Sequence, residues 1–270
     1  MRGFLIAVTF LTRLPFPAPA DVTQEEFTAS QRYYPLIGLL LGIIMSLSAL
    51  LLRSFYPPLV VAAFLLIEEL LLTGGIHMDG FMDSMDALWS ARTPERMLEI
   101  MKDSRVGSFG ALSASAILLL KFSLLAGLLQ GSGSLLSFSS NFSSLNYQSL
   151  STFGPFFAVL IMPTLSRWLF LFGILFYPYA RKTGLGQGFH ESSLNRPCFF
   201  IIEGLICLAL AVYLLGWAGL VGLLLAFLFL FYFTQKVSHL LGGLTGDLYG
   251  ASIELSELLF LIGVVPFFIN

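Results

Sequence analysis

The sequence predicts an all-α fold, a polytopic membrane helical bundle of about six to seven transmembrane helices with additional interfacial helices. Hydrophobic residues make up 57% of the chain and charged residues only 11%, whereas soluble domains carry about 25% charged residues. The mean hydropathy is +0.86, and several apolar runs approach the roughly 20 residues that cross a bilayer as a helix. We expect residues 1–270 to form a single integral-membrane domain.

The expected spans follow the apolar runs in chain order. They cover residues 36–52, 58–74, 109–129, 155–176, 199–216 and 218–234. The last apolar run, residues 258–269, is short for a span, and we expect it to be only partly inserted. The first run, between Arg2 and Arg13, is too short to cross, and we expect an interfacial or re-entrant segment of the mature protein.

Charged residues inside the expected spans need partners, because an unpaired charge is costly in a bilayer. For Glu68 and Glu69, either the span ends before them or one of them faces the same cavity as the acidic residues that follow. Lys121 lies inside the third span. For Arg167, in the fourth span, the partner is either a buried carboxylate or the phosphate of a substrate.

Ionisable side chains are concentrated in residues 73–108, between two expected spans. Six of the sixteen carboxylate residues lie there, namely Asp79, Asp83, Asp86, Glu95, Glu99 and Asp103. The first three stand at i, i+4 and i+7, which places their carboxylates within about 60° of one another on a helix. They form either a solvated polar face or a site for Mg²⁺, which proteins hold through one or two carboxylates together with substrate phosphates. The scarcity of charge in this chain favours Mg²⁺.

The second half of this segment is predicted to lie on the membrane surface. Pro94 suits the first position of a helix over residues 94–101, whose apolar face fits an interfacial location. The polar turn that follows can return Asp103 and Arg105 to the three aspartates.

Two further polar segments can join the same site. Residues 177–198 form a basic, glycine-rich loop that contains Arg181, which is either a phosphate cradle or a plain flexible loop. Residues 242–257 hold Asp247 and two glutamates among four glycines. By contrast, the serine-rich and uncharged residues 131–152 are expected to be a flexible loop without chemistry.

The basic residues outside the spans divide unevenly if the spans alternate and residues 73–108 are cytoplasmic. The far side then receives Arg53 alone. The cytoplasmic side receives Arg2, Arg13, Arg32, Arg92, Arg96, Lys102, Arg105, Arg181, Lys182, Arg196 and Lys236. This distribution predicts a protein of the cytoplasmic (inner) membrane with one site facing the cytoplasm. The net charge of -2 points to no nucleic-acid partner.

An acidic helix face, nearby arginines and glycine turns on one side of a membrane suit metal-assisted phosphoryl transfer. Carboxylates hold Mg²⁺, arginine stabilises the charge of the transition state, and a further carboxylate or a histidine takes the proton from an attacking hydroxyl. The sequence contains no G-x-x-x-x-G-K-[ST], G-x-S-x-G or H-E-x-x-H motif.

Four segments together resemble the cobalamin synthase family, the adenosylcobinamide-GDP ribazoletransferases. They are FLTRLPFP (10–17), TGGIHMDGFMDSMDAL (73–88), LEIMKDSRVGSFGAL (98–112) and LGGLTGDLYGASIELSE (241–257). The resemblance covers nearly the whole chain. It implies a Mg²⁺-dependent membrane enzyme that joins adenosylcobinamide-GDP to α-ribazole, or to α-ribazole 5′-phosphate, and releases GMP late in vitamin B12 assembly. The ribose hydroxyl of the acceptor would attack the phosphate next to the cobinamide arm.

Together with the residue patterns, the resemblance assigns candidate roles. The candidate metal ligands are Asp79, Asp83, Asp86, Asp103 and Asp247, and the candidates for the general base are Asp86 and His77. The candidate substrate-binding residues are Lys102, Ser104, Arg105, Arg167, Arg181, Glu254 and Glu257. Ala87 and Leu248 depart from the family pattern, which has glycine and a small polar residue there, and neither change removes a ligand.

Two rival functions remain open at this point. The three-acid pattern also resembles the membrane CDP-alcohol phosphotransferases, which release CMP. A transporter for a corrinoid or an ion would place its carboxylates near the middle of the membrane, and acidic residues gathered in loops on one side argue against it. The sequence does not fix the oligomeric state, so a homo-oligomer in the lipid bilayer also remains open.

Overall fold

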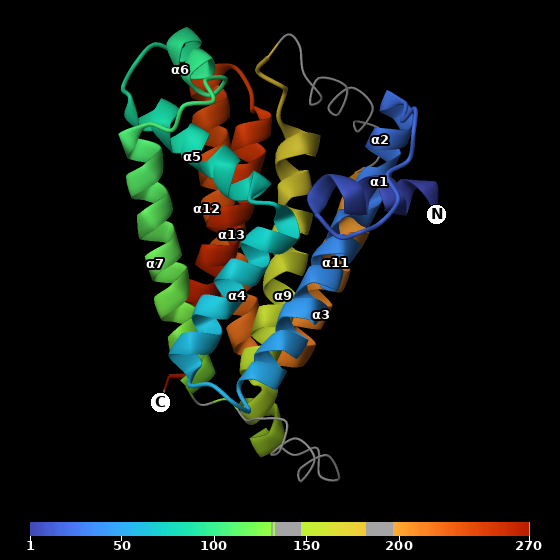
Figure 1. Cartoon of the computed structure of the whole chain (residues 1–270). Coiled ribbons are helices and arrows are strands. Elements are labelled where there is room, and N and C mark those ends of the chain that lie inside the picture. The colour runs from blue at the N-terminus through green and yellow to red at the C-terminus, as the bar shows by residue number, and fades with distance from the viewer. Residues whose placement is uncertain (131, 133–146, 182–196, 270) are drawn as a thin grey trace.

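The computed structural model describes residues 1–130, 132, 147–181 and 197–269. Within these ranges the regular structure is helical, apart from an isolated bridge between Tyr179 and Leu244. Most helices run along one axis and form a bundle (Figure 1). Helices α5 (Ile76–Trp89) and α6 (Pro94–Ile100) lie at one end of it, which we call the acidic end because α5 carries the three aspartates.

The spanning helices follow the apolar runs closely. In chain order the other helices are α1 (Arg2–Leu11), α2 (Gln24–Ser30), η1 (Gln31–Tyr33), α3 (Tyr34–Leu52), α4 (Pro58–Thr73), α7 (Ser108–Gln130), α9 (Tyr147–Phe176), α11 (Pro197–Leu215), α12 (Trp217–Leu241), α13 (Gly246–Val264) and η2 (Val265–Phe267). In the described part of the chain, six helical segments are long and apolar enough to cross a membrane, or seven if α4 and α5 count as one bent span. The predicted helical membrane bundle is therefore confirmed.

A sharp corner separates α4 from α5. Gly74 and Gly75 between them have φ values of 66° and 71°, a left-handed conformation that glycine adopts at little cost. The two helices meet at 93°, so α5 turns away from the direction of α4 at the acidic end of the bundle (Figure 1). We therefore place α5 outside the membrane-spanning segments.

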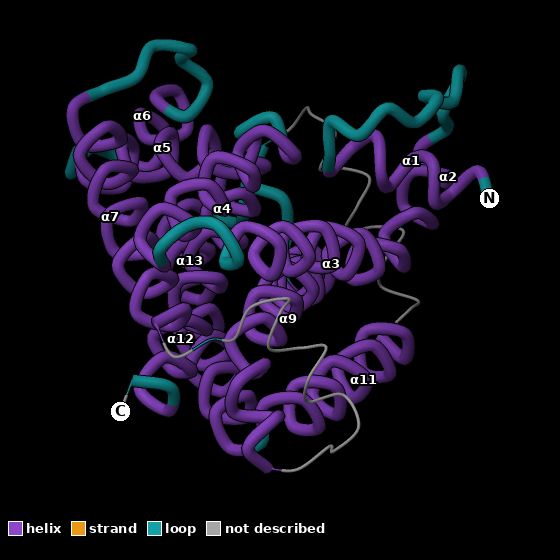
Figure 2. Tube along the Cα trace, turned by 60° about the horizontal axis from the view of Figure 1, so that its bottom comes forward, coloured by secondary structure: helices purple, strands orange, loops and turns teal. Residues whose placement is uncertain are grey.

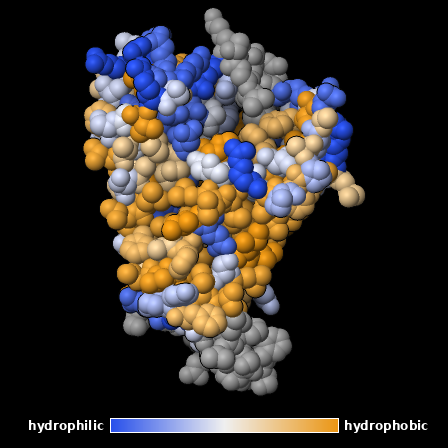
Figure 3. Space-filling view, viewed as in Figure 1, coloured by the Kyte–Doolittle hydropathy of each residue, from blue (hydrophilic) through white to orange (hydrophobic). Residues whose placement is uncertain are grey.

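Helices α9 and α13 form the centre of the bundle, with α3, α7, α11 and α12 around them (Figure 2). Most of the residues in these two helices are buried, whereas the surrounding spans keep most of theirs on the surface. Helix α3 approaches α9 closely, because a Cβ on Gly38 or Gly42 would collide with the carbonyl oxygens of Pro163 and Leu160. The outer surface is apolar around the middle of the bundle and polar at the acidic end (Figure 3), as a bilayer requires.

The structure corrects the expected partial insertion of residues 258–269. These residues continue α13, and one helical segment, Gly246–Phe267, is long enough to cross a membrane. The prediction was wrong because the first half of this segment contains carboxylates, which lower its apparent hydropathy. Inside the protein those carboxylates find cationic partners instead of water, so a central helix can carry them.

Helix α6 lies where the sequence predicted a surface helix. Its residue Met97 is buried, as is Met101 directly after it, and the Thr245 hydroxyl contacts the Met101 sulfur at 3.5 Å. The apolar face of α6 therefore packs against protein. Most of the serine-rich stretch 131–152, and the glycine-rich part of the 177–198 loop, lie outside the described residues.

Candidate active site

The aspartate face of α5 lies beside the first turns of α13, because two glycines let the helices approach closely. A Cβ on Gly80 would lie 2.9 Å from the carbonyl oxygen of Asp247, and a Cβ on Gly250 would lie 2.9 Å from that of His77. Side chains larger than hydrogen would push the helices apart. The crossing brings Asp247 to the acidic face of α5, so two segments far apart in sequence form one cluster.

Asp83 is the electrostatic centre of this cluster. Partial burial, together with the negative charges of Asp79, Asp247 and Asp86, raises its pKa from 3.8 to about 7, against a smaller opposing effect of Arg181. In the part of the chain that the structure describes, the side-chain carboxylates of Asp79 and Asp83 accept no hydrogen bond and form no ion pair. Their carboxylate oxygens are therefore available to a cation.

Arg181 reaches the cluster from the chain after α9. Its guanidinium pairs with Asp247 at 2.6 Å, and both side chains are largely buried. Backbone hydrogen bonds between residues 178–180 and Leu244, each 2.8 Å long, hold this segment against the turn before α13. The acidic helix, the start of the basic loop and the 242–257 segment thus meet at one end of the bundle, as the sequence predicted.

Asp86 has a different environment from the other two aspartates of α5. Its carboxylate accepts hydrogen bonds from the backbone N–H groups of Gly107, at 2.7 Å, and Gly110, at 2.8 Å. A Cβ at position 107 would lie 2.7 Å from the Asp86 Cγ, and one at position 110 would lie 3.0 Å from it. Asp86 therefore anchors the chain before α7 and caps the first turn of that helix, and both glycines are needed for the approach.

Asp103 and Arg105 form their own exposed pair near the site. The guanidinium contacts the Asp103 carboxylate at 2.6 Å, with 87% of the arginine side chain and 40% of the aspartate side chain exposed. Hydrogen bonds from the Arg105 side chain and backbone lower the pKa of Asp103 to about 2. No hydrogen bond or ion pair among the described residues joins this pair to the aspartates of α5. Lys102 and Ser104 beside it are exposed as well.

The residues of the α5 face fit a hard cation by their donor chemistry, since they offer only carboxylate oxygens. Among the described residues, no three His, Cys, Asp or Glu side chains already surround one point at metal-binding distance. Mg²⁺ needs only one or two carboxylates when water and substrate phosphates complete its shell. Asp79 and Asp83 are the residues that would hold it there.

A second ionic cluster lies inside the bundle and joins four helices. The Lys121 ammonium lies 3.1 Å from Glu69, 3.1 Å from Glu254 and 2.8 Å from Glu257, and Glu257 also pairs with Arg167. All five side chains are buried. Arg167 thus has the carboxylate partner that was one of its two predicted alternatives. Glu254 and Glu257 likewise point into this cluster, so the structure shows no open surface on which these three residues would meet a substrate.

The same cluster explains the two glutamates of α4. The helix continues through both of them to Thr73, so the first of the two alternatives, a span that ends before them, was wrong. Glu69 binds Lys121, and Glu68 accepts a hydrogen bond of 2.7 Å from the Ser48 hydroxyl. The Lys121 ammonium on α7 pairs with the Glu69 carboxylate. This pairing allows a carboxylate inside a helix from which hydropathy alone would exclude it.

His77 lies at the start of α5 and is buried. Its Nε2 has no hydrogen-bond partner among the described residues. Gly250 of α13 packs on its backbone. The histidine therefore lies on the side of α5 that faces the protein, whereas Asp79 lies on the exposed side.

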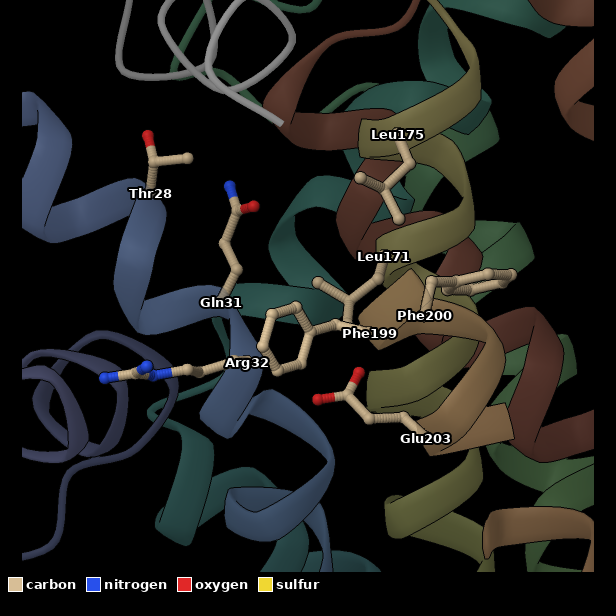
Figure 4. Close-up of a pocket in the computed structure, with 8 residues that line it drawn as sticks. All are labelled: Thr28, Gln31, Arg32, Leu171, Leu175, Phe199, Phe200 and Glu203. Carbon is tan, nitrogen blue, oxygen red and sulfur yellow. The ribbon is translucent and has the colours of Figure 1, made fainter. Parts of the chain in front are cut away.

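One pocket lies away from the aspartates (Figure 4). It is formed by α2, η1, α9 and α11, with Gln31, Leu171, Phe199 and the Glu203 carboxylate among its lining residues. None of the sequence-predicted site residues lines it. It therefore does not belong to the candidate site.

Comparison with known proteins identifies the family. A family model described as cobalamin-5-phosphate synthase matches residues 3–265. The chain belongs to this family. A relative from Desulfitobacterium hafniense (strain Y51) is 60% identical over 98% of this chain and 97% of its own, and carries the name adenosylcobinamide-GDP ribazoletransferase.

More distant members of the cobalamin-5-phosphate synthase family carry the same name. The relative from Klebsiella pneumoniae (strain 342) is 35% identical over 98% of this chain and all of its own, and that from Alkaliphilus oremlandii is 32% identical over 97% and 96%. No solved structure matches the chain. Family membership makes the protein an enzyme of cobalamin synthesis.

Sequence reasoning missed several residues that shape this site. The hydrogen bonds from Gly107 and Gly110 to Asp86 were not foreseen, although the glycine spacing just before an apolar helix was a usable signal for a close approach. The partnership of Lys121 with Glu69 was also missed. In that case the signal was an unpaired charge in each of two expected spans.

Proposed function

We propose that this protein is a Mg²⁺-dependent adenosylcobinamide-GDP ribazoletransferase of the cytoplasmic (inner) membrane. It joins adenosylcobinamide-GDP to α-ribazole, or to α-ribazole 5′-phosphate, and releases GMP. The observation that carries the proposal is the free carboxylates of Asp79 and Asp83 beside the Arg181–Asp247 pair. The names of the relatives supply the donor substrate and the group transferred.

The reaction exchanges one bond to phosphorus for another. A ribose hydroxyl oxygen of the acceptor bonds to the phosphorus next to the cobinamide arm. The bond from that phosphorus to the oxygen bridging to GMP breaks, GMP leaves with the electron pair, and the hydroxyl proton passes to a base. Bound Mg²⁺ would neutralise the phosphate oxygens and the leaving group.

The residues of the acidic end take positions that suit these steps. Asp79 and Asp83 would hold the cation, and Asp247 adds negative charge on the α13 side. Arg181 is fixed by Asp247 and can donate to a phosphate oxygen from its remaining N–H groups. Lys102, Ser104 and Arg105 are exposed on the loop before α7, where they can contact the substrate as it enters.

Asp86 and His77 are the candidates for the base, and their surroundings differ. Both oxygens of Asp86 already accept backbone N–H groups, which favours a role in positioning the loop. The Nε2 of His77 has no partner among the described residues. It can accept a proton only from a substrate that reaches the buried side of α5. Separate pH–rate profiles of Asp86→Asn and His77→Gln distinguish them, because only loss of the base removes the corresponding limb of the profile.

The orientation follows from the ends of the bundle. Arg13, Arg92 and Arg105 belong to segments at the acidic end, whereas Arg53 follows α3 at the opposite end (Figure 1). Basic residues favour the cytoplasmic side of bacterial membranes. The acidic end therefore faces the cytoplasm, where nucleotide-activated substrates are made.

Product release from purified protein in lipid vesicles tests the proposal. With adenosylcobinamide-GDP supplied, we expect GMP only when both α-ribazole and Mg²⁺ are present. CMP release from a CDP-alcohol would instead support the lipid phosphotransferase reading. Corrinoid uptake into the vesicles without any nucleotide product would support a transporter.

A further inference from the structure

Arg13 lies where the chain after α1 meets the corner between α4 and α5. Its backbone N–H donates to the carbonyl oxygen of Leu72 at 2.7 Å. Its side chain lies against Gly74, because a Cβ at position 74 would come within 2.7 Å of the Arg13 Cγ. The glycine thus leaves the space that the arginine side chain occupies, and the corner holds Arg13 in place.

Arg13 and Asp79 line the same open cleft, whose volume is about 390 Å³. That volume lies within the usual range for a small-molecule site, roughly 300–1,000 Å³. Gly74 and Gly75 form the corner of the cleft. Its remaining lining is apolar and consists of Leu70, Ile76, Met78 and Met82. The cleft therefore combines one cation, one carboxylate of the candidate metal site and an apolar wall.

The Arg13 guanidinium forms no ion pair within the described ranges. Five other arginines there pair with a carboxylate, namely Arg2, Arg96, Arg105, Arg167 and Arg181. An exposed, unpaired guanidinium beside a cleft offers a fork of N–H donors that fits two oxygens of a phosphate group. The other charged residue in the cleft lining is Asp79, so an anion bound to Arg13 would share this cleft with a carboxylate of the candidate metal site.

We propose that this cleft binds a phosphate group carried by a substrate, with Arg13 as its ligand, and we assign that phosphate to α-ribazole 5′-phosphate. The inference rests on the proposed function. The apolar wall formed by Ile76, Met78 and Met82 can pack against the base of this acceptor. With its phosphate on Arg13, the acceptor lies beside Asp79, where its ribose hydroxyl is needed.

Kinetics of Arg13→Met with two acceptors test the assignment. We expect the KM for α-ribazole 5′-phosphate to rise by about tenfold or more, since a charge-assisted bond to phosphate is lost, while the KM for α-ribazole without the phosphate stays the same. Arg13→Lys, which keeps the charge, should recover part of the loss. Arg92→Met is the matched control, because it also removes an exposed positive charge at the acidic end but does not line the cleft.

Each alternative source of phosphate has its own signature. A raised KM for adenosylcobinamide-GDP with either acceptor would overturn the assignment to the acceptor. An Arg13→Met effect that appears only in vesicles of anionic lipid, and not in phosphatidylcholine vesicles, would overturn it in favour of a lipid headgroup. Equal KM changes for both acceptors, or no change, would also overturn it. GMP release by the wild-type protein is measured first. Absence of that release would contradict the proposed function, whereas the variants test only the role of Arg13.

Discussion

The carboxylate of Asp86 and the backbone N–H of Gly107 lie 2.7 Å apart, although the residues are separated by twenty-one positions in the chain. With the matching bond from Gly110 at 2.8 Å, this contact fastens the loop that carries Asp103 and Arg105 to α5, the helix of the candidate site. Asp86 therefore couples the shape of that loop to the position of the aspartate face.

Gly110→Ala tests this coupling. The added Cβ would lie 3.0 Å from the Asp86 Cγ and 2.7 Å from the Met82 carbonyl oxygen, so we expect the free energy of unfolding to fall by about 1–3 kcal/mol. Thermal unfolding in detergent measures the change. Gly246→Ala is the control, because a Cβ there meets no atom within 4 Å. Equal stability of the two variants would show that the close approach is not needed.

Asp83→Asn tests the cation site. The amide removes the charge of the half-buried carboxylate at the centre of the cluster but keeps its size, so we expect GMP release to fall by about 100-fold or more in a protein that stays folded. Glu95→Gln, at an exposed position of α6, should keep normal activity. Normal turnover in Asp83→Asn would remove this residue from the site.

The raised pKa of Asp83 predicts how pH affects Mg²⁺ binding. Because the folded-state pKa of about 7 exceeds the ordinary 3.8, the metal-free folded protein holds this proton up to about pH 7. The contribution of Asp83 to the free energy of unfolding therefore declines as the pH rises from 3.8 to 7 and is level above that. Below pH 7, Mg²⁺ must displace the proton, so its affinity should drop by about tenfold for each pH unit.

Calorimetry measures that proton directly. Titrations with Mg²⁺ in two buffers of different ionisation enthalpy should show about one proton released at pH 6 and almost none at pH 8. Asp83→Asn should release none at either pH. Equal release by the wild-type protein at both pH values would mean that Asp83 is not the group displaced.

Lys121→Met tests the buried ionic cluster. The variant leaves three buried carboxylates with Arg167 as their remaining cation, and breaking a buried network by removing one partner costs about 3–5 kcal/mol. We expect a large drop in the thermal unfolding temperature in detergent. Lys236→Met removes an exposed ammonium that lies over the Tyr232 ring and should cost about 1 kcal/mol or less. A Lys121→Met protein as stable as this control would contradict a structural role for the cluster.

Much of the architecture could be predicted because a bilayer makes hydropathy informative. The limits of most spans, the place of α5 and α6 at one end of the bundle, and the meeting of the 73–108 and 242–257 segments follow from apolar run length and charge distribution. The spacing of Asp79 and Asp83 is likewise a local property of one helix. The limits of a span and the spacing of residues on one helix depend only on the sequence near each residue.

The remainder depended on which helices are neighbours, and one sequence does not contain that information directly. The sequence made Glu254 a candidate substrate-binding residue, because its buried partner, Lys121, is 133 residues away. The position of α13 inside the bundle depends on the same pairing with Lys121, so it was missed as well. For Asp86, the i+7 spacing correctly placed the side chain on the acidic face, but the backbone donors that occupy its oxygens come from the next loop.

A crystal of the protein soaked with Mn²⁺, which replaces Mg²⁺ and scatters anomalously, tests the central claim most directly. We predict an anomalous difference peak about 2.1 Å from a carboxylate oxygen of Asp79 and of Asp83, on the side of α5 that faces Asp247. A map without a peak on this face, or with the ion bound only at the exposed Asp103, would contradict the account.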